Sequence, residues 1–149
     1  MPLKEQLMQD LKDAMKNKDT IRKNTIQLVR ASILQIEKDK KVTLSEEEVI
    51  EVLAKELKKR KDVLPEYEKS GREDLIDDLK KEIEVITSYL PKQLSKEELE
   101  KIVRQEIENV GALTIKDIGK IMSAVLPKVK GRADGKDVNE IARAILSTK

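Results

Sequence analysis

The sequence predicts an all-α protein, and three observations support this fold class. Apolar residues recur at three- and four-residue spacing along most of the chain, which is typical of helices with one buried face. Charged residues make up 40% of the 149 residues, and the Lys and Glu that dominate them favour helix. Helix-start signals recur between the apolar stretches. The expected architecture is an N-terminal helical hairpin bundle of four longer helices, followed by a C-terminal three-helix tail domain.

The helix-start signals are capping boxes, in which a Ser or Thr hydroxyl and a carboxylate three residues later bind each other's backbone N–H groups. Their hydroxyl and carboxylate residues are Ser45 with Glu48, Ser95 with Glu98, and the weaker Thr114 with Asp117. Asp137 is the expected N-cap of the last helix, since Asp accepts hydrogen bonds from free N–H groups at a helix start. The start of each of these helices is therefore predicted to within a few residues.

The longer helices are expected from Leu3 to about Met15, over 20–40, over 45–70 and over 75–90. Pro65 falls inside the third, where proline removes a backbone hydrogen bond and clashes with the preceding turn. The third helix is expected to kink at Pro65, with an early end and restart as the alternative. The residues expected to face the core of these helices are Leu3, Leu7, Leu11, Ala14 and Met15; Ile21, Thr25, Leu28, Val29, Ile33 and Ile36; Val49, Val52, Leu53, Leu57 and Leu64; and Leu75, Leu79, Ile83, Ile86 and Leu90.

A domain boundary is expected near Pro91, which ends the fourth helix. We predict an N-terminal domain over residues 1–92 and a C-terminal domain over residues 93–149. Three shorter helices are expected after the boundary, over 95–109, 114–128 and 137–147. Their core faces are expected to hold Leu99, Ile102, Val103 and Ile107; Ile115, Ile118, Met122, Val125 and Leu126; and Val138, Ile141, Ala142 and Ile145.

The composition excludes several classes of site. The chain has no Cys and no His, so it lacks thiol chemistry, the commonest acid–base group and the commonest zinc ligand. We therefore expect no catalytic, cofactor-binding or metal-binding residues. No apolar run reaches the ~18 residues that a transmembrane helix needs, and the N-terminus lacks the apolar stretch of a signal peptide. We expect a cytoplasmic protein without membrane partners.

Basic residues gather in the C-terminal part of the chain. Residues 1–92 hold 20 basic and 20 acidic residues, whereas residues 93–149 hold 11 and 9. The basic cluster comprises Lys116, Lys120, Lys128, Lys130, Arg132 and Lys136, and its last four members flank Gly131 in a connection between two helices. Cations and backbone N–H groups of such a loop can meet phosphate oxygens together. The plainer alternative is a set of ordinary solvated lysines in a helix connection.

A second basic run, Lys58–Lys61, lies on the third expected helix. Four consecutive residues spread around a helix rather than forming one stripe. Glu51 and Asp62 stand four residues from Lys55 and Lys58, the spacing of intrahelical ion pairs. We interpret this run as a solvated helix surface.

The stretch IGKIMSAVLPKVKGRADG, from Ile118 to Gly135, resembles the signature of the YqeY proteins. It is also similar to the tail domain of the GatB subunit of tRNA-dependent amidotransferases. The runs ELKKRKD, from Glu56 to Asp62, and YLPKQL, from Tyr89 to Leu94, resemble the YqeY family as well. The resemblance therefore covers nearly the whole chain, and its C-terminal motif is the specific part.

This resemblance implies a helical domain followed by a three-helix tail that helps to hold tRNA. It also implies a carbon–nitrogen ligase label with glutamine as amide donor, although amide chemistry in the amidotransferase belongs to other parts of the assembly. The family motif places the RNA-facing helix end and loop at Gly119, Lys120, Lys128, Lys130, Gly131 and Arg132. With Lys116 and Lys136 from the basic cluster, these residues form the candidate RNA-binding site.

The expected partners are tRNA or another structured RNA and, as further candidates, amidotransferase or synthetase subunits. Two alternatives to a non-catalytic tRNA-binding accessory module remain open. The chain is a component or activator of a glutamine-dependent carbon–nitrogen ligase, or it is an adaptor that binds other proteins through its N-terminal helices. The sequence assigns no oligomeric state.

Overall fold

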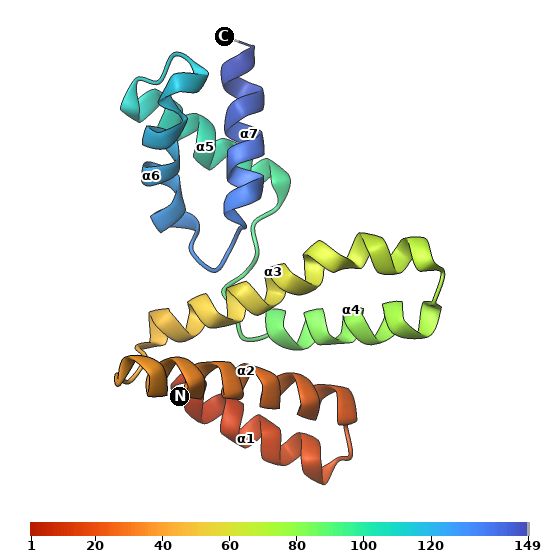
Figure 1. Ribbon diagram of the computed structural model, residues 1–149. Coiled ribbons are helices and arrows are strands. Elements are labelled where there is room, and N and C mark those ends of the chain that lie inside the picture. The colour runs from red at the N-terminus through yellow and green to blue at the C-terminus, as the bar shows by residue number, and fades with distance from the viewer. Residues whose placement is uncertain (149) are drawn as a thin grey trace. The chain divides into compact units, whose positions relative to one another are not determined.

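The computed structural model describes residues 1–148, and every regular element in that range is helical (Figure 1). The predicted all-α class is confirmed for this part of the chain. The elements are α1 (Leu3–Lys16), α2 (Thr20–Lys40), α3 (Glu46–Ser70), α4 (Glu73–Thr87), α5 (Lys96–Val110), the 3₁₀ helix η1 (Ile115–Asp117), α6 (Ile118–Val129) and α7 (Gly135–Ser147). Within residues 1–148, no helix combines the length and the apolar character needed to cross a membrane.

The chain divides into two compact units, unit 1 (Met1–Pro91) and unit 2 (Lys92–Lys149). Helices α1 to α4 lie in unit 1, and α5, η1, α6 and α7 lie in unit 2. Each unit has its own cluster of buried apolar side chains.

The capping boxes form as predicted. Glu48 N donates to Ser45 Oγ at 3.2 Å, and Ser45 N donates to a Glu48 carboxylate oxygen at 3.1 Å. Ser95 and Glu98 repeat this geometry at the start of α5. The Glu98 carboxylate accepts a hydrogen bond from the Ser95 backbone N–H, and this bond is the main cause that lowers the pKa of Glu98 below its ordinary value.

The predicted start of the last helix is wrong. The N-cap of α7 is Asp134, whose carboxylate accepts the backbone N–H of Lys136 at 3.1 Å, and Asp137 lies inside the first turn. Both acids suit a helix N-terminus. Asp134 takes the cap because the chain is extended there and helical from Gly135 onward.

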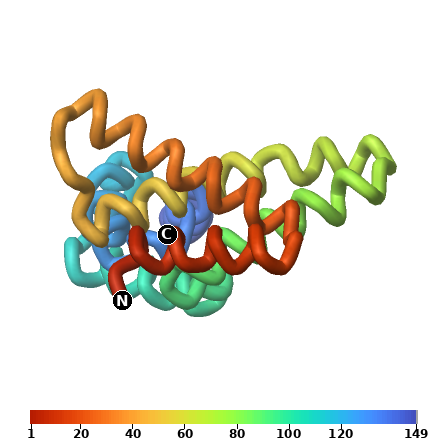
Figure 2. The backbone as a smooth tube through the Cα atoms, turned by 90° about the horizontal axis from the view of Figure 1, so that it is seen from below, coloured from red at the N-terminus to blue at the C-terminus, as the bar shows by residue number. Residues whose placement is uncertain are grey.

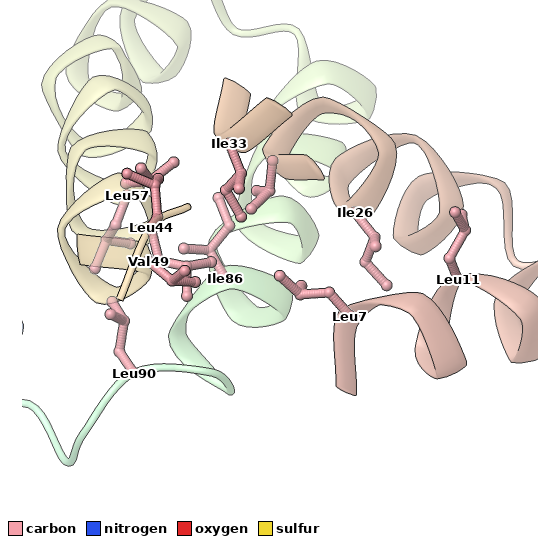
Figure 3. Close-up of a cluster of buried hydrophobic side chains, with 12 residues drawn as sticks. Leu7, Leu11, Ile26, Ile33, Leu44, Val49, Leu57, Ile86 and Leu90 are labelled. Atoms are coloured by element: carbon pink, nitrogen blue, oxygen red, sulfur yellow. The ribbon is translucent and has the colours of Figure 1, made fainter. Parts of the chain in front are cut away.

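The core of unit 1 is built from the inner faces of its four helices (Figure 3). Leu7 of α1, Ile26 of α2 and Ile86 of α4 are fully buried. Figures 1 and 2 show that the paired α3 and α4 extend past the turn that joins α1 to α2, so the far end of this hairpin lies beyond α1 and α2.

Helix α3 runs unbroken through Pro65, which excludes the alternative of an early end and restart.

The second basic run is not wholly a solvated surface. Arg60 is buried, and its guanidinium donates to the buried Glu56 carboxylate at 2.9 Å. It also lies 3.4 Å from a carboxylate oxygen of Glu82 on α4. Arg60 therefore forms a buried ion pair within α3 and links α3 to α4 through Glu82, whereas its neighbours Lys59 and Lys61 are exposed.

Five residues that helical spacing assigned to the core are exposed instead. They are Met15 (56% exposed), Leu28 (47%), Leu75 (40%), Ile115 (43%) and Leu126 (39%). Spacing of three and four residues identifies the apolar side of a helix, but it does not distinguish residues at the edge of that side from residues at its centre. Leu28 is an edge position, since the neighbouring Val29 is the one that is buried on α2.

The core of unit 2 packs the three helices α5, α6 and α7 against one another. Val103 from α5, Val125 from α6 and Val138 from α7 are fully buried at its centre. The 3₁₀ helix η1 precedes α6, and the predicted capping box of Thr114 and Asp117 forms there. The chain therefore forms a 3₁₀ turn at Ile115–Asp117, where the sequence predicted the first residues of the α-helix itself.

Candidate RNA-binding site

The structure spreads the eight candidate residues over both ends of α6 and the connection that follows. Lys116 lies in η1, Gly119 and Lys120 in the first turn of α6, Lys128 in its last turn, Lys130, Gly131 and Arg132 in the connection, and Lys136 in the first turn of α7. Helix α6 has 12 residues, so at ~1.5 Å per residue it is roughly 18 Å long. The candidate cations thus form two groups at the two ends of one helix.

Helical periodicity sorts these residues into different faces of α6. Ile121, Val125 and Val129 are buried against α5 and α7. On the opposite, exposed side lie Gly119, Lys120 and Ser123, and the exposed Pro127 follows them one turn later. Lys116 and Lys130, just beyond the two ends of the helix, are also exposed. We call these five residues, Lys116, Gly119, Lys120, Ser123 and Lys130, the α6 face.

Gly119 leaves open space on the α6 face. A Cβ built at this glycine meets no atom within 4 Å, so packing inside the protein does not require glycine here. Glycine in a helix is nevertheless less stable than alanine by roughly 0.5–1 kcal/mol. Together with the small Ser123, it makes the middle of this face shallow between lysines at both ends.

Lys128 does not belong to the α6 face. Its Nζ donates to the carboxylate of Glu106 on α5, which is buried with a side chain only 6% exposed. A buried carboxylate without a cation is costly, so Lys128 stabilises the contact between α5 and α6. Glu106 was not predicted to take part here, although this acid lies on the apolar stripe of α5 three residues after Val103.

The connection after α6 is held in place by hydrogen bonds within unit 2. Gly131 has a φ of 74°, which glycine adopts without strain. The backbone N–H groups of Arg132 and Ala133 both donate to the carbonyl of Val129, at 2.8 and 3.1 Å. These two amides therefore serve the turn itself and are not the loop N–H groups that could meet phosphate.

The segment before α5 also fastens this connection. Gln93 Nε2 donates to the Gly131 carbonyl at 2.7 Å, and Leu94 N donates to the Arg132 carbonyl at 2.9 Å. Arg132 Nε donates to the Lys92 carbonyl at 3.1 Å. The connection is thus fastened to the segment before α5 by hydrogen bonds, and Arg132 takes part in holding it.

Acidic groups balance some of the positive charge. Lys120 Nζ lies 3.9 Å from an Asp117 carboxylate oxygen. Hydrogen bonds from the Leu113 and Thr114 amides are the main cause that lowers the pKa of Asp117, and Lys120 adds to this effect. The Lys120 side chain is 72% exposed, so its ammonium group can reach a ligand while Asp117 keeps its place at the start of α6.

This arrangement suits a polyanion better than a small substrate. The α6 face carries exposed cations at both ends and small residues between them, and a sugar–phosphate backbone is contacted mainly by such cations. Among residues 1–148 there is no group of three or more His, Cys, Asp or Glu side chains that could hold a metal ion. The α6 face is therefore the candidate site for contacts with phosphate groups.

Comparison with known proteins identifies relatives over most of the chain. The family described as "Yqey-like protein" matches residues 4–146. Two similar proteins are both named "Altered inheritance of mitochondria protein 41, mitochondrial". The one from Pyrenophora tritici-repentis is 25% identical over 147 residues, 96% of this chain and 80% of the relative. The one from Kluyveromyces lactis is 38% identical over 130 residues, 81% of this chain and 70% of the relative.

The word "mitochondrial" in these names describes the relatives, and the cytoplasmic localisation of the present chain stays a prediction. The family match begins in α1 and ends in α7, so it includes the α6 face and both units. The chain therefore belongs to the YqeY family.

Proposed function

We propose that this protein binds structured RNA, most specifically tRNA, through the α6 face of unit 2. The observation that supports the proposal is the pairing of exposed lysines at both ends of α6 with Gly119 and Ser123 between them. A shallow helix face of this kind admits a phosphate backbone close to the helix. The resemblance to the tail domain of GatB supports tRNA among structured RNAs.

The residues of the α6 face favour RNA binding that does not depend on the base sequence. The two aromatic residues of the chain, Tyr67 and Tyr89, belong to unit 1, so unit 2 offers no ring on which an unstacked base can lie. Lysines bind phosphates as point charges and do not distinguish sequences. In this proposal unit 2 is a three-helix tail that recognises RNA shape and charge, unit 1 is a bundle of four helices, and the chain is an accessory module rather than a catalyst.

The dependence of binding on salt tests the proposal. A titration of the full chain with total tRNA at several salt concentrations is expected to give an affinity that falls as salt rises. With about three phosphates engaged, the slope of log K against log salt is near −2 to −3, at ~0.7–0.9 per phosphate. Undetectable binding at low salt, or binding that does not change with salt, contradicts the proposal.

Gly119→Ala separates RNA binding from folding. Because the added methyl group meets no protein atom, the variant is expected to be more stable than the wild type by roughly 0.5–1 kcal/mol. The same methyl group projects from the α6 face, so we expect weaker tRNA binding. Thermal unfolding and the tRNA titration measure the two effects. Equal or tighter tRNA binding by this variant argues against close approach of RNA at Gly119.

A further inference from the structure

Unit 1 contains a groove that its own helices leave open. It lies between α2 and α3 and has a volume of about 450 Å³. Its apolar lining includes Leu28, Ala31 and Ile36 from α2 and Val52 from α3, and Lys55 and Lys59 stand on its α3 side. Leu28 is 47% exposed, so the groove presents apolar surface to solvent beside two cations.

The polar floor of the groove has its partners within the chain. The Glu56 carboxylate accepts hydrogen bonds from Ser32 Oγ at 3.4 Å and from Lys59 Nζ at 3.3 Å, in addition to the bond from Arg60. Because α2 and α3 run in opposite directions, the Ser32–Glu56 contact sets Leu28 beside the Lys59 end of the groove. The Glu56 carboxylate is therefore paired within unit 1, and the surface that the groove exposes to solvent is mainly apolar.

The same side of α3 continues as a stripe of two charge signs. Lys55, Lys59, Asp62 and Glu66 follow one another at spacings of four, three and four residues, which places them along one side of the helix. All four side chains are exposed. The half of the stripe beside the groove is basic, and the half toward the far end of the α3–α4 hairpin is acidic.

This stripe is complementary to itself when it is reversed. In an antiparallel pair of α3 helices, one register brings Lys55 level with Glu66 of the second copy. The same register brings Lys59 level with Asp62 of the second copy. A two-fold axis repeats both pairs, so a single arrangement brings every charge of the stripe level with an opposite charge, and Lys59 also keeps its contact with Glu56. We propose that the α2–α3 groove and this stripe form the interface of a homodimer with antiparallel α3 helices.

Apolar residues complete the interface in this register. Val63 and Tyr67, each 37% exposed, lie next to the acidic half of the stripe. In the dimer Val63 of the second copy comes level with the Leu28 end of the groove. Tyr67 of the second copy comes level with the middle of the groove, near Lys55. Tyr67 is thus the expected occupant of the groove, and its aromatic ring buries apolar area on both copies.

Charge complementarity favours a second copy over an unrelated acidic helix. An acidic partner would satisfy Lys55 and Lys59 but would face Asp62 and Glu66 with like charge. A second copy satisfies both halves of the stripe. The surface is confined to two helices, so we expect a reversible, concentration-dependent dimer. This inference concerns unit 1 and does not depend on RNA binding by unit 2.

Charge reversal on one copy, compensated by the opposite reversal on the other copy, tests the dimer. Lys55→Glu and Glu66→Lys each reverse one charge of the Lys55–Glu66 pair and leave Lys59 in place on the buried Glu56. By sedimentation velocity of the full chain, the wild type is expected to dimerise with rising concentration, and each variant alone to stay monomeric. An equimolar mixture of the two variants is expected to form a heterodimer, and the variant with both changes a homodimer again.

The control is Lys12→Glu/Lys61→Glu, which reverses two exposed lysines outside the stripe and is expected to dimerise like the wild type. Circular dichroism melts establish that every variant is folded. A wild type that stays monomeric at all concentrations overturns the proposal. So does a mixture that fails to associate while the wild type does, because association then uses another surface. Co-purification of the wild-type monomer with an acidic partner would assign the groove to that partner instead.

Discussion

Replacing Lys116, Lys120 and Lys130 together with glutamate is expected to weaken tRNA binding by roughly 100-fold. All three side chains are exposed on the α6 face. Loss of three charge-assisted contacts at about 1 kcal/mol each corresponds to two orders of magnitude in the dissociation constant. The salt dependence is expected to become shallower as well, because fewer counterions are released on binding.

A matched variant makes this result specific to the α6 face. Lys96→Glu/Lys101→Glu/Arg104→Glu changes the charge of unit 2 by the same amount, but at exposed positions of α5. We expect it to lose much less affinity, in titrations at the same salt concentration. If both triple variants lose affinity equally, binding depends on the net charge of the unit and not on a site at α6.

Lys128 and Arg132 are unsuited to this test, although the sequence analysis assigned both to the site. Lys128→Glu places a second carboxylate against the buried Glu106. Arg132→Glu removes the hydrogen bond to the Lys92 carbonyl that helps to hold the connection after α6. Weaker RNA binding by either variant would therefore not distinguish a lost phosphate contact from a disturbed fold.

Arg60→Ala is expected to destabilise unit 1 by about 3 kcal/mol. The substitution removes the strongest partner of the Glu56 carboxylate, whose side chain is 5% exposed, and also the link to Glu82 on α4. Removal of one member of a buried ion pair leaves a charge that water cannot reach. The bond from Lys59 keeps the loss toward the lower end of the range for such pairs.

Chemical denaturation measures this effect, and a double variant provides its control. Glu56→Met/Arg60→Leu replaces both charges with apolar side chains and is expected to restore most of the lost stability. A loss below ~1 kcal/mol for Arg60→Ala would mean that the pair behaves like an exposed salt bridge. The buried Glu56–Arg60 pair within α3 and the Arg60–Glu82 contact to α4 would then contribute little to the stability of unit 1.

Local signals in the sequence predicted the helices well. Ser45 and Ser95 each compete only with their immediate neighbours for the N-cap position, so a four-residue pattern is sufficient. At the last helix two acids three residues apart, Asp134 and Asp137, both suit the cap. The choice between them depends on where the connection from α6 ends, which a local pattern does not contain.

The candidate site was predicted as a set of residues, but its division into faces was not. The basic cluster lies in one stretch of sequence and can be read from it. The partner of Lys128, in contrast, is Glu106 on another helix, 22 residues earlier. The exposed Leu28 is a similar case, because only the packing of α2 against its neighbours shows which edge of its apolar stripe stays open.

The most direct test of the central claim is an NMR titration of the 17.0 kDa chain with tRNA, followed through its backbone amide signals. If the α6 face binds RNA, the signals of residues 116–130 shift or broaden first, and those of α5 residues near Lys101 change little. Changes confined to unit 1 or to the exposed side of α5, or no changes at a salt concentration that permits binding, contradict this account.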